Sequence, residues 1–213
     1  MDLYFSPLAC SLSARIALYE AGASADFVEV DSKTKRTSRG EDFVTVNPLR
    51  LVPTLRTDDQ QVLTENAAIL QYLGRRHPEA SLLPADESGL MRAQQWLCFL
   101  GTELHKGLFT PLLDSKTPEG AKQYARDKYL SRLDVIEAQL TGREFLLDTF
   151  SVADAYLIVM LNWTVPTAID LSRWPAIKAY AKRLRERPSV ARAMAEERDL
   201  YNTEQDRHVQ ARV

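Results

Sequence analysis

The sequence predicts an α+β protein, with a small mixed α/β domain over roughly residues 1–80 and an all-helical domain over roughly residues 87–200. Strand and helix patterns alternate in the first part, whereas only helix patterns occur in the second. The stretch 79–86 between them contains Pro84 and is expected to be a linker. The last segment, 201–213, is polar and is expected to fray.

The first domain is expected to follow the order β-α-β and then β-β-α. Its elements are, in order, a strand at 3–5, a helix at 13–21, strands at 27–30, 53–56 and 62–64, and a helix at 65–76. Gly22 ends the first helix. His77-Pro78 ends the second, because proline disfavours helical geometry in the residue before it.

The second domain is expected to contain helices at 90–108 and 118–140, and three more that Ser151, Pro175 and Pro188 open. Ser151 and Asp154 have the spacing of a capping box, in which each side chain bonds the backbone amide of the other residue. The run 155–163 that follows is almost wholly apolar, so this helix should be buried.

Composition excludes several classes of protein. The chain has 213 residues and a formal net charge of −2, which gives no electrostatic support for binding nucleic acid or an anionic membrane. No apolar run reaches the length of a membrane span, and no signal peptide is apparent, so we expect a cytoplasmic protein. Two cysteines, Cys10 and Cys98, are expected to be thiols, and no Cys/His cluster has metal spacing, so no metal is expected.

Cys10 lies where the first strand turns into the first helix. Amides at a helix N-terminus and the helix dipole favour a thiolate there, which predicts sulfur chemistry. A small buried apolar cysteine is the alternative, and position alone leaves both open. The residue three positions later is Ser13, so an internal Cys-x-x-Cys disulfide cannot form. A thiol from elsewhere would have to resolve any disulfide at Cys10. A small-molecule thiol such as glutathione is the obvious candidate, and Cys98, on the other predicted domain, is the alternative.

Three other local signals are ambiguous by themselves. The Val52–Pro53 bond is an ordinary trans bond or a cis bond that turns the Val52 backbone towards a ligand. Glu65 with Asn66 begins a helix, where amides can hold a carboxylate or Glu65 can simply act as a capping acid. His105 near a helix C-terminus is explained by the dipole without any ligand.

Taken together and in this order, the motifs resemble cytosolic glutathione S-transferases, most closely the bacterial beta class, over essentially the whole chain except the tail. The matching motifs are Tyr4-Phe5-Ser6-Pro7, Ala9-Cys10-Ser11-Leu12-Ser13, Val46-Asn47-Pro48, Val52-Pro53, Leu63-Thr64-Glu65, Glu103-Leu104-His105-Lys106 and Ser151-Val152-Ala153-Asp154-Ala155-Tyr156. The resemblance implies the fold of that family, a thioredoxin-like N-terminal domain and a helical C-terminal domain. It also implies a homodimer and a cis Val52–Pro53 bond.

The resemblance further implies the glutathione contacts. The backbone of Val52, before Pro53, matches the residue that pairs with the cysteinyl part of glutathione. Glu65 and Asn66 match the pair that holds the γ-glutamyl end, and Lys35 matches a basic residue near the glycine carboxylate.

The same resemblance implies the catalytic residues. Cys10 matches the thiol beside the glutathione sulfur, where it can form a mixed disulfide, and backbone amides near Cys10 and Ser11 would stabilise the thiolate. His105 matches a histidine near Cys10 and the open substrate site. Glu103 matches a residue that reaches the ligand of the neighbouring subunit.

Two positions depart from the family pattern. Asn66 stands where Ser or Gly is usual, and Cys98 stands where related sequences often carry Asn.

The function implied is a glutathione transferase that joins glutathione to small hydrophobic electrophiles, carries out thiol-disulfide exchange through Cys10, or does both. The helical domain would bind the electrophile, with Phe109, Leu112, Leu113 and Trp163 as candidate apolar walls and burial in the core favoured for Trp163. The alternatives are a non-catalytic ligand-binding or protein-interaction dimer, and an isomerase or dehalogenase of the same fold. The sequence names no electrophile.

Overall fold

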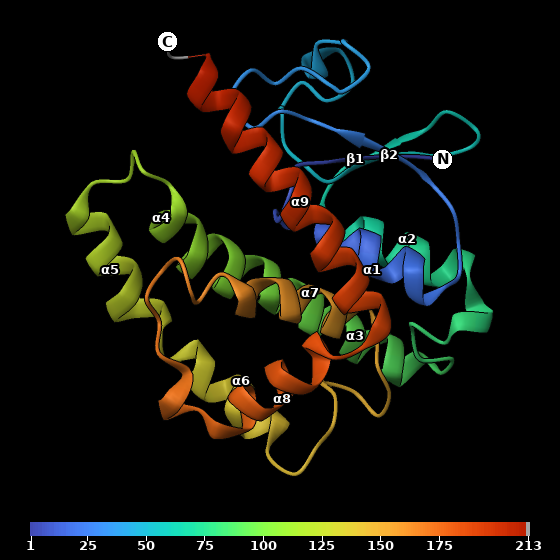
Figure 1. The fold of residues 1–213 in the computed structure, drawn as a ribbon. Coiled ribbons are helices and arrows are strands. Elements are labelled where there is room, and N and C mark those ends of the chain that lie inside the picture. Colours follow the sequence, from blue (N-terminus) through green and yellow to red (C-terminus); the bar gives the residue numbers. More distant parts are fainter. Residues whose placement is uncertain (212–213) are drawn as a thin grey trace. The chain divides into compact units, whose positions relative to one another are not determined.

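The computed structural model describes residues 1–211, and the chain divides into two compact units (Figure 1). Unit 1 combines Met1–Ala80 with the chain from Pro188 onward, and unit 2 is Ser81–Arg187. Each unit has its own buried core.

Unit 1 is built on a sheet whose four described strands have the order β2-β1-β3-β4. The strands are β1 (Asp2–Phe5), β2 (Asp26–Glu29), β3 (Thr54–Arg56) and β4 (Val62–Leu63). β1 pairs parallel with β2 and antiparallel with β3, and β3 pairs antiparallel with β4. All four strands lie within one residue of their predicted ends. β1 is central and its residues Leu3, Tyr4 and Phe5 are buried, as its apolar sequence requires.

The helices of unit 1 are α1 (Leu12–Glu20), α2 (Asn66–Arg76) and α9 (Pro188–Gln210), with short 3₁₀ turns η1 (Phe43–Thr45) and η2 (Pro78–Ala80). α1 packs against both α2 and α9 (Figure 1). The first two helices were predicted, at 13–21 and 65–76. α1 is buried continuously from Leu12 to Leu18, including the polar residues Ser13 and Arg15.

The structure corrects the prediction for the C-terminus. The prediction assigned the chain up to residue 200 to the helical domain and a fraying tail to 201–213, whereas α9 is one helix through Gln210 and groups with unit 1. Residues 212 and 213 of that predicted tail lie outside the described residues. The inward face of α9 includes Glu197, Glu204 and His208, all buried. A buried face made of polar residues resembles a solvated face in the sequence, which explains the error.

Unit 2 is helical. Its elements are α3 (Glu87–Phe99), η3 (Leu100–Phe109), α4 (Thr110–Leu113), α5 (Glu119–Tyr129), α6 (Arg132–Leu140), α7 (Val152–Asn162), η4 (Leu171–Arg173) and α8 (Pro175–Arg185). The predicted helix 90–108 is longer, because α3, η3 and α4 follow one another without a break. The predicted helix 118–140 is instead two helices, α5 and α6. Bonds from the amides of Leu133 and Asp134 to carbonyls three residues back tighten the chain between them.

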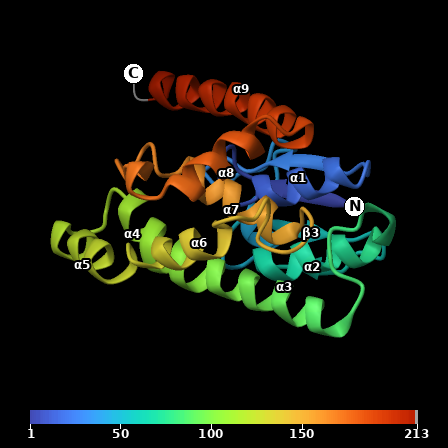
Figure 2. The same ribbon diagram turned by 90° about the horizontal axis from the view of Figure 1, so that it is seen from below.

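α7 contacts α3, η3 and α8 and is buried along almost its whole length (Figure 2). The predicted capping box is confirmed. Asp154 is fully buried, and one oxygen, Oδ2, accepts hydrogen bonds from the Ser151 amide at 2.9 Å and the Ser151 hydroxyl at 2.8 Å. The other, Oδ1, accepts from the Leu146 amide at 2.9 Å and the Tyr180 hydroxyl at 2.8 Å. Asp154 therefore fixes the start of α7 and joins it to α8.

None of the helices within residues 1–211 combines the length and the hydropathy that a membrane span requires.

Replacing Asp154 with alanine should lower the free energy of unfolding by about 2–4 kcal/mol, because several buried donors lose their acceptor. The measurement is urea unfolding followed by circular dichroism. Glu144→Ala, at an exposed position in the loop before α7, is the matched control and should change stability by less than about 0.5 kcal/mol. Equal stabilities for the two variants would contradict this account of α7.

Candidate functional site

Cys10 lies in the loop that joins β1 to α1 and is 8% exposed. Its thiol donates a hydrogen bond to the Val52 carbonyl oxygen, with 3.2 Å between Sγ and O. The amides of Leu12 and Ser13 bond the carbonyls of Ala9 and Cys10, each at 3.1 Å. These two amides of the first helical turn are therefore used within the turn. These two amides are therefore not available to a Cys10 thiolate, and the predicted stabilisation would have to come from the helix dipole or from other amides of the loop.

Ser11 closes the same loop. Its hydroxyl donates to the Ser6 carbonyl at 3.2 Å and accepts from the Ser6 amide at 3.3 Å. The residue is fully buried. The Ser11 side chain therefore has a structural task, and only its backbone is left for the binding role that was predicted.

The Val52–Pro53 bond is cis, which confirms the prediction. The segment before it is held by Asn47, whose side-chain amide donates to the Leu51 carbonyl at 2.9 Å and to the Thr54 hydroxyl at 3.0 Å. The Thr54 hydroxyl also donates to the Leu51 carbonyl, at 3.1 Å. These bonds keep the Val52 backbone in place against Cys10. Asn47 is buried. Its position in a turn motif of the sequence indicated neither this burial nor its role in holding the segment before Pro53.

Glu65 and Asn66 lie at the start of α2, as predicted, but their side chains differ in access. Glu65 is exposed and has a positive φ of 64°, and its carbonyl accepts from the Ile69 amide at 3.0 Å. Asn66 is 7% exposed, and its Nδ2 donates to the Ser13 hydroxyl at 2.9 Å. That hydroxyl lies 2.7 Å from the Cys10 carbonyl oxygen. The Asn66 side chain thus links α2 to α1 below Cys10.

Lys35 lies in the loop that follows β2 and is half-buried, with a positive φ of 58°. Its amide donates to the Asp31 carbonyl at 3.1 Å, and its carbonyl accepts from the Phe43 amide at 2.9 Å. Lys35, Val52, Pro53, Glu65 and Asn66 all belong to unit 1 with Cys10.

Glu197 on α9 supports the Cys10 loop from inside unit 1. One carboxylate oxygen accepts from the Leu8 amide at 2.7 Å, and the other accepts from Arg15 Nε at 2.9 Å. The Arg15 guanidinium stacks on Phe5 and Phe27, 4.4 and 3.9 Å from their ring centroids. Burial raises the pKa of Glu197, and the Arg15 charge and the Leu8 amide oppose that effect. No feature of the sequence indicated this role, because Glu197 lies in a run of charged residues.

His105 lies in η3 of unit 2, a stretch with π-helical hydrogen bonding of the kind often found at functional sites. Its Nδ1 is 2.6 Å from the Tyr156 hydroxyl oxygen, and its ring centroid is 5.1 Å from that of Trp163. Burial lowers the pKa of His105 to about 4, and Lys106 adds to this effect. The imidazole is therefore neutral at pH 7. The contact of His105 with Tyr156 was not predicted, although Tyr156 is the last residue of the motif 151–156 that contains the capping box.

The other predicted residues of unit 2 have mixed outcomes. Glu103 forms an ion pair with Arg132 on α6, with 2.9 Å between Glu103 Oε2 and Arg132 Nε. The Glu103 carboxylate is therefore engaged within its own chain. Trp163 is 9% exposed, which confirms the predicted burial, and Phe109 is fully buried, so it is not an accessible wall. Leu113 is 41% exposed and Leu112 is half-buried, so these two remain open to a ligand.

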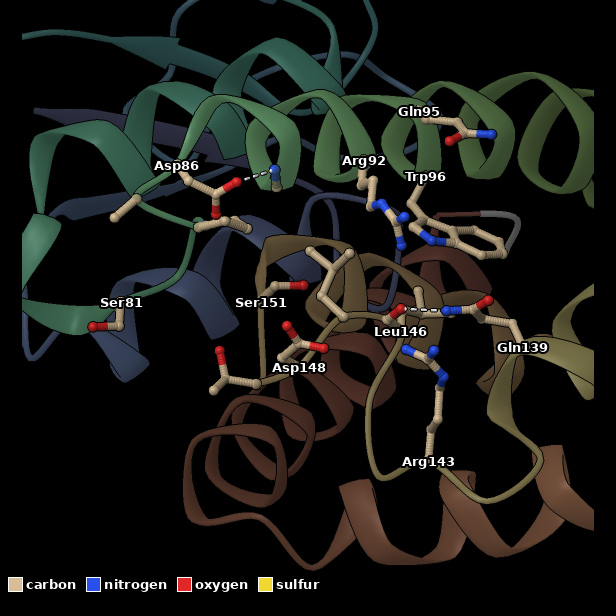
Figure 3. A pocket seen from close by; sticks show the side chains of 15 residues that line it. Ser81, Asp86, Arg92, Gln95, Trp96, Gln139, Arg143, Leu146, Asp148 and Ser151 are labelled. Atoms are coloured by element: carbon tan, nitrogen blue, oxygen red, sulfur yellow. Dashed lines mark hydrogen bonds between the residues drawn. The ribbon is translucent and has the colours of Figure 1, made fainter.

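Unit 2 also contains a cavity of about 490 Å³ between the first part of α3 and the segment 139–151 (Figure 3). Arg92 and Arg143 extend towards it from opposite walls, beside Trp96. None of the predicted site residues lines this cavity. It is therefore separate from the residues on which the functional prediction depends.

A buried thiol held against a cis-proline loop, in a unit with this strand order, defines a protein of thioredoxin-like fold with a helical second unit. Comparison with known proteins narrows this class. The family models "Glutathione S-transferase, N-terminal domain" and "Glutathione S-transferase, C-terminal domain" match residues 9–76 and 96–188. The chain belongs to the glutathione S-transferase family.

Individual relatives agree with this assignment. Glutathione S-transferase GstA of Escherichia coli O157:H7 is 38% identical over 92% of this chain and 98% of that protein. The bacterial glutathione S-transferase BphK, solved in a ternary complex, has a TM-score of 0.89 and 43% identity, over 92% of this chain and 99% of that one. A beta-class enzyme from Sphingomonas chungbukensis has a TM-score of 0.87 and 42% identity, over 92% and 98% of the two chains. The chain is thus a glutathione transferase of beta-class type.

An isomerase is more distant. Maleylpyruvate isomerase of Ralstonia sp is 30% identical over 78% of this chain and 82% of that protein. The predicted isomerase alternative therefore has relatives of its own but is not favoured over the transferase.

The lowered pKa of His105 predicts how the protein responds to acid. A histidine in the unfolded chain takes up its proton near pH 6.5, whereas His105 in the folded protein does so near pH 4. Its contribution to stability is thus present above pH 6.5 and is lost as pH falls towards 4, by roughly 3 kcal/mol in total.

The direct measurement is an NMR titration of the histidine ring carbons, with His105 assigned from a His105→Gln variant. We expect the His105 signal to stay at its neutral position from about pH 8 down to about pH 5.5. A midpoint above about pH 6 would contradict the burial of this imidazole.

Proposed function

We propose that glutathione binds to unit 1 along the cis-proline loop and the start of α2, with its sulfur beside Cys10. The observation that carries this proposal is the contact of 3.2 Å between the Cys10 sulfur and the Val52 carbonyl oxygen. It joins the reactive thiol to the stretch of backbone that is suited to pair with the cysteinyl part of the ligand. Support comes from a related sphingomonad glutathione S-transferase that was solved with glutathione, at 43% identity and a TM-score of 0.88.

The ends of glutathione would be held by groups of matching charge. The exposed Glu65 carboxylate suits the α-amino group of the γ-glutamyl end, and the backbone amide of Asn66 in the first turn of α2 suits its carboxylate. The Asn66 side chain is engaged with Ser13, so the backbone is the part available for this contact. The Lys35 ammonium suits the glycine carboxylate.

In conjugation, the glutathione thiolate would attack the electrophile, forming a carbon–sulfur bond while the leaving group departs with the electron pair of the bond that breaks. The electrophile would bind on unit 2, where Leu112 and Leu113 offer apolar surface. His105 is neutral and can act as a hydrogen-bonding group, with Tyr156 fixing its ring.

In exchange, the Cys10 thiolate would attack the glutathione sulfur of a mixed disulfide, GS–SR. A Cys10–glutathione disulfide forms and RS⁻ leaves. A second glutathione thiolate then attacks the Cys10-bound glutathione, which releases GSSG and regenerates the Cys10 thiolate. No second protein cysteine is needed, in agreement with Ser13 at the third position after Cys10.

We also propose a homodimer, in keeping with the family. Large apolar side chains are exposed on each unit: Leu49 (65%), Leu51 (51%) and Val62 (45%) on unit 1 and Met91 (61%) on α3. Exposed apolar side chains mark an interface where they form a contiguous patch, and these four are the candidates for the dimer contact. To contact the ligand of the partner subunit in that dimer, the Glu103 carboxylate would first have to break its ion pair with Arg132.

The test is a Cys10→Ala variant, with Cys98→Ala as the matched control because Cys98 is the exposed cysteine of unit 2. Cys10→Ala should keep glutathione binding within about threefold of the wild type, since the contacts to the ligand backbone remain. It should lose the exchange of glutathione mixed disulfides by at least two orders of magnitude or so, because the nucleophile is gone. Cys98→Ala should behave as the wild type, and unchanged exchange in Cys10→Ala would refute the redox role.

A further inference from the structure

The C-terminal end of α9 lies against the loop that carries Lys35. We propose that Glu204 and His208 are positioning residues for glutathione, acting through this loop to present the Lys35 ammonium to the glycine carboxylate. This inference rests on the proposed role of Lys35. It gives a function to a part of the chain whose composition had predicted a fraying tail.

The loop Asp31–Arg36 contains one strained residue, Lys35, whose backbone conformation depends on the hydrogen bonds of the loop. Lys35 has a φ of 58°, in the left-handed region that a lysine rarely adopts. Such a conformation persists only where the surroundings fix it. The bonds that fix this loop therefore decide where the Lys35 side chain starts.

The amides from Ser32 to Lys35 are all engaged, and most of them lead to Asp31. Asp31 Oδ1 accepts from the amides of Lys33 at 3.0 Å and Thr34 at 2.7 Å, and the Asp31 carbonyl accepts from the Lys35 amide at 3.1 Å. This is the pattern of an Asx turn. The orientation of the Asp31 carboxylate thus sets the turn that ends at Lys35.

The loop is also held by the Phe43 amide, which bonds the Lys35 carbonyl at 2.9 Å, and by the Asp31 amide, which bonds the Arg36 carbonyl at 2.9 Å. α9 adds two further contacts. His208 Nε2 lies 2.9 Å from Asp31 Oδ2, the oxygen that the turn does not use, and Glu204 Oε1 accepts from the Ser32 amide at 2.7 Å. Glu204 and His208 are 2% and 8% exposed, so water competes little for either bond. One turn of α9 thus holds both the first amide of the loop and the side chain that organises the others.

The charges around this contact are mutually consistent. Burial opposes ionisation of Asp31, but hydrogen bonds from Thr34, His208 and Lys33 lower the pKa of its carboxyl to about 2. Arg207, between Glu204 and His208 in the sequence, pairs with Glu29 at the end of β2. α9 therefore contacts both the end of β2, through Arg207, and the loop that follows it, through Glu204 and His208.

The test compares glutathione with its glycine monoethyl ester, which lacks the glycine carboxylate, by calorimetric titration of the full-length protein. We expect the wild type to bind glutathione about tenfold more tightly than the ester, and Lys35→Ala to remove most of this preference. Glu204→Ala should weaken glutathione by about 3–10-fold but the ester by less than about twofold, because only the carboxylate contact depends on the loop.

Three further variants sharpen the test. Glu204→Gln keeps an oxygen for the Ser32 amide and should stay within about twofold of the wild type. His208→Ala should lose part of the preference by releasing Asp31. Asp206→Asn, on an exposed position of the same turn, is the matched control and should change nothing. EDTA in the buffer excludes a bound metal as the cause, since Asp31, Glu204 and His208 offer ligand atoms within 4.8 Å of one another.

The outcomes separate the inference from the function on which it rests. If the wild type does not bind glutathione, the proposed function is wrong. If it binds but Lys35→Ala keeps the preference over the ester, the role of Lys35 is wrong, and the inference is wrong with it. If Lys35→Ala loses the preference while Glu204→Ala and His208→Ala keep it in full, the inference alone is overturned. A loss of stability with equal weakening of both ligands would also overturn it, because a merely structural role predicts that result.

Discussion

The buried Glu197 carboxylate, with Arg15 and the Leu8 amide, is the interaction on which the thiol site depends. Leu8 has a φ of 60°, which is strained for a leucine, and Glu197 holds its amide two residues before Cys10. The Arg15 and Glu197 side chains are only 5% and 0% exposed, so the pair is out of water. Arg15 also pairs with Glu196 at 3.2 Å, so it keeps one acidic partner if Glu197 is replaced, whereas the Leu8 amide loses its bond to the Glu197 carboxylate. Glu197 is thus the group that ties the Cys10 loop to α9.

The same helix reaches both loops of unit 1 that the proposed function uses. Glu197 holds the loop before Cys10, and Glu204, two turns further along α9, holds the loop that carries Lys35. Residues spaced by seven lie on one face of a helix, so a single packed face can serve both contacts. The segment before the cis-proline is fixed separately, by Asn47 and Thr54. In the proposed site, the scaffold would thus present the backbone in fixed positions, which would lower the entropy cost of binding a flexible tripeptide.

Sequence reasoning predicted what local rules control. The strands, the capping box of Ser151 and Asp154 and the apolar α7 follow from periodicity and capping, and the structure has them. The resemblance to a family supplied the cis bond at Pro53. Contacts between distant polar residues were missed, such as Glu197 with Leu8, because a buried polar face looks like a solvated one. Asn66 was expected to help hold the γ-glutamyl end of glutathione, and the bond of its side chain to Ser13 was not predicted. The predicted roles of the site residues, the homodimer, the absence of a metal and the cytoplasmic location stay predictions.

The central claim is that unit 1 binds glutathione, and calorimetric titration of the reduced, full-length protein with glutathione tests it most directly. The account predicts saturable binding with a dissociation constant in the micromolar to millimolar range, about 4–8 kcal/mol of binding free energy. The titration is run at two temperatures, because the enthalpy of binding can pass through zero at one of them. Absence of saturable heat at both temperatures would contradict the account.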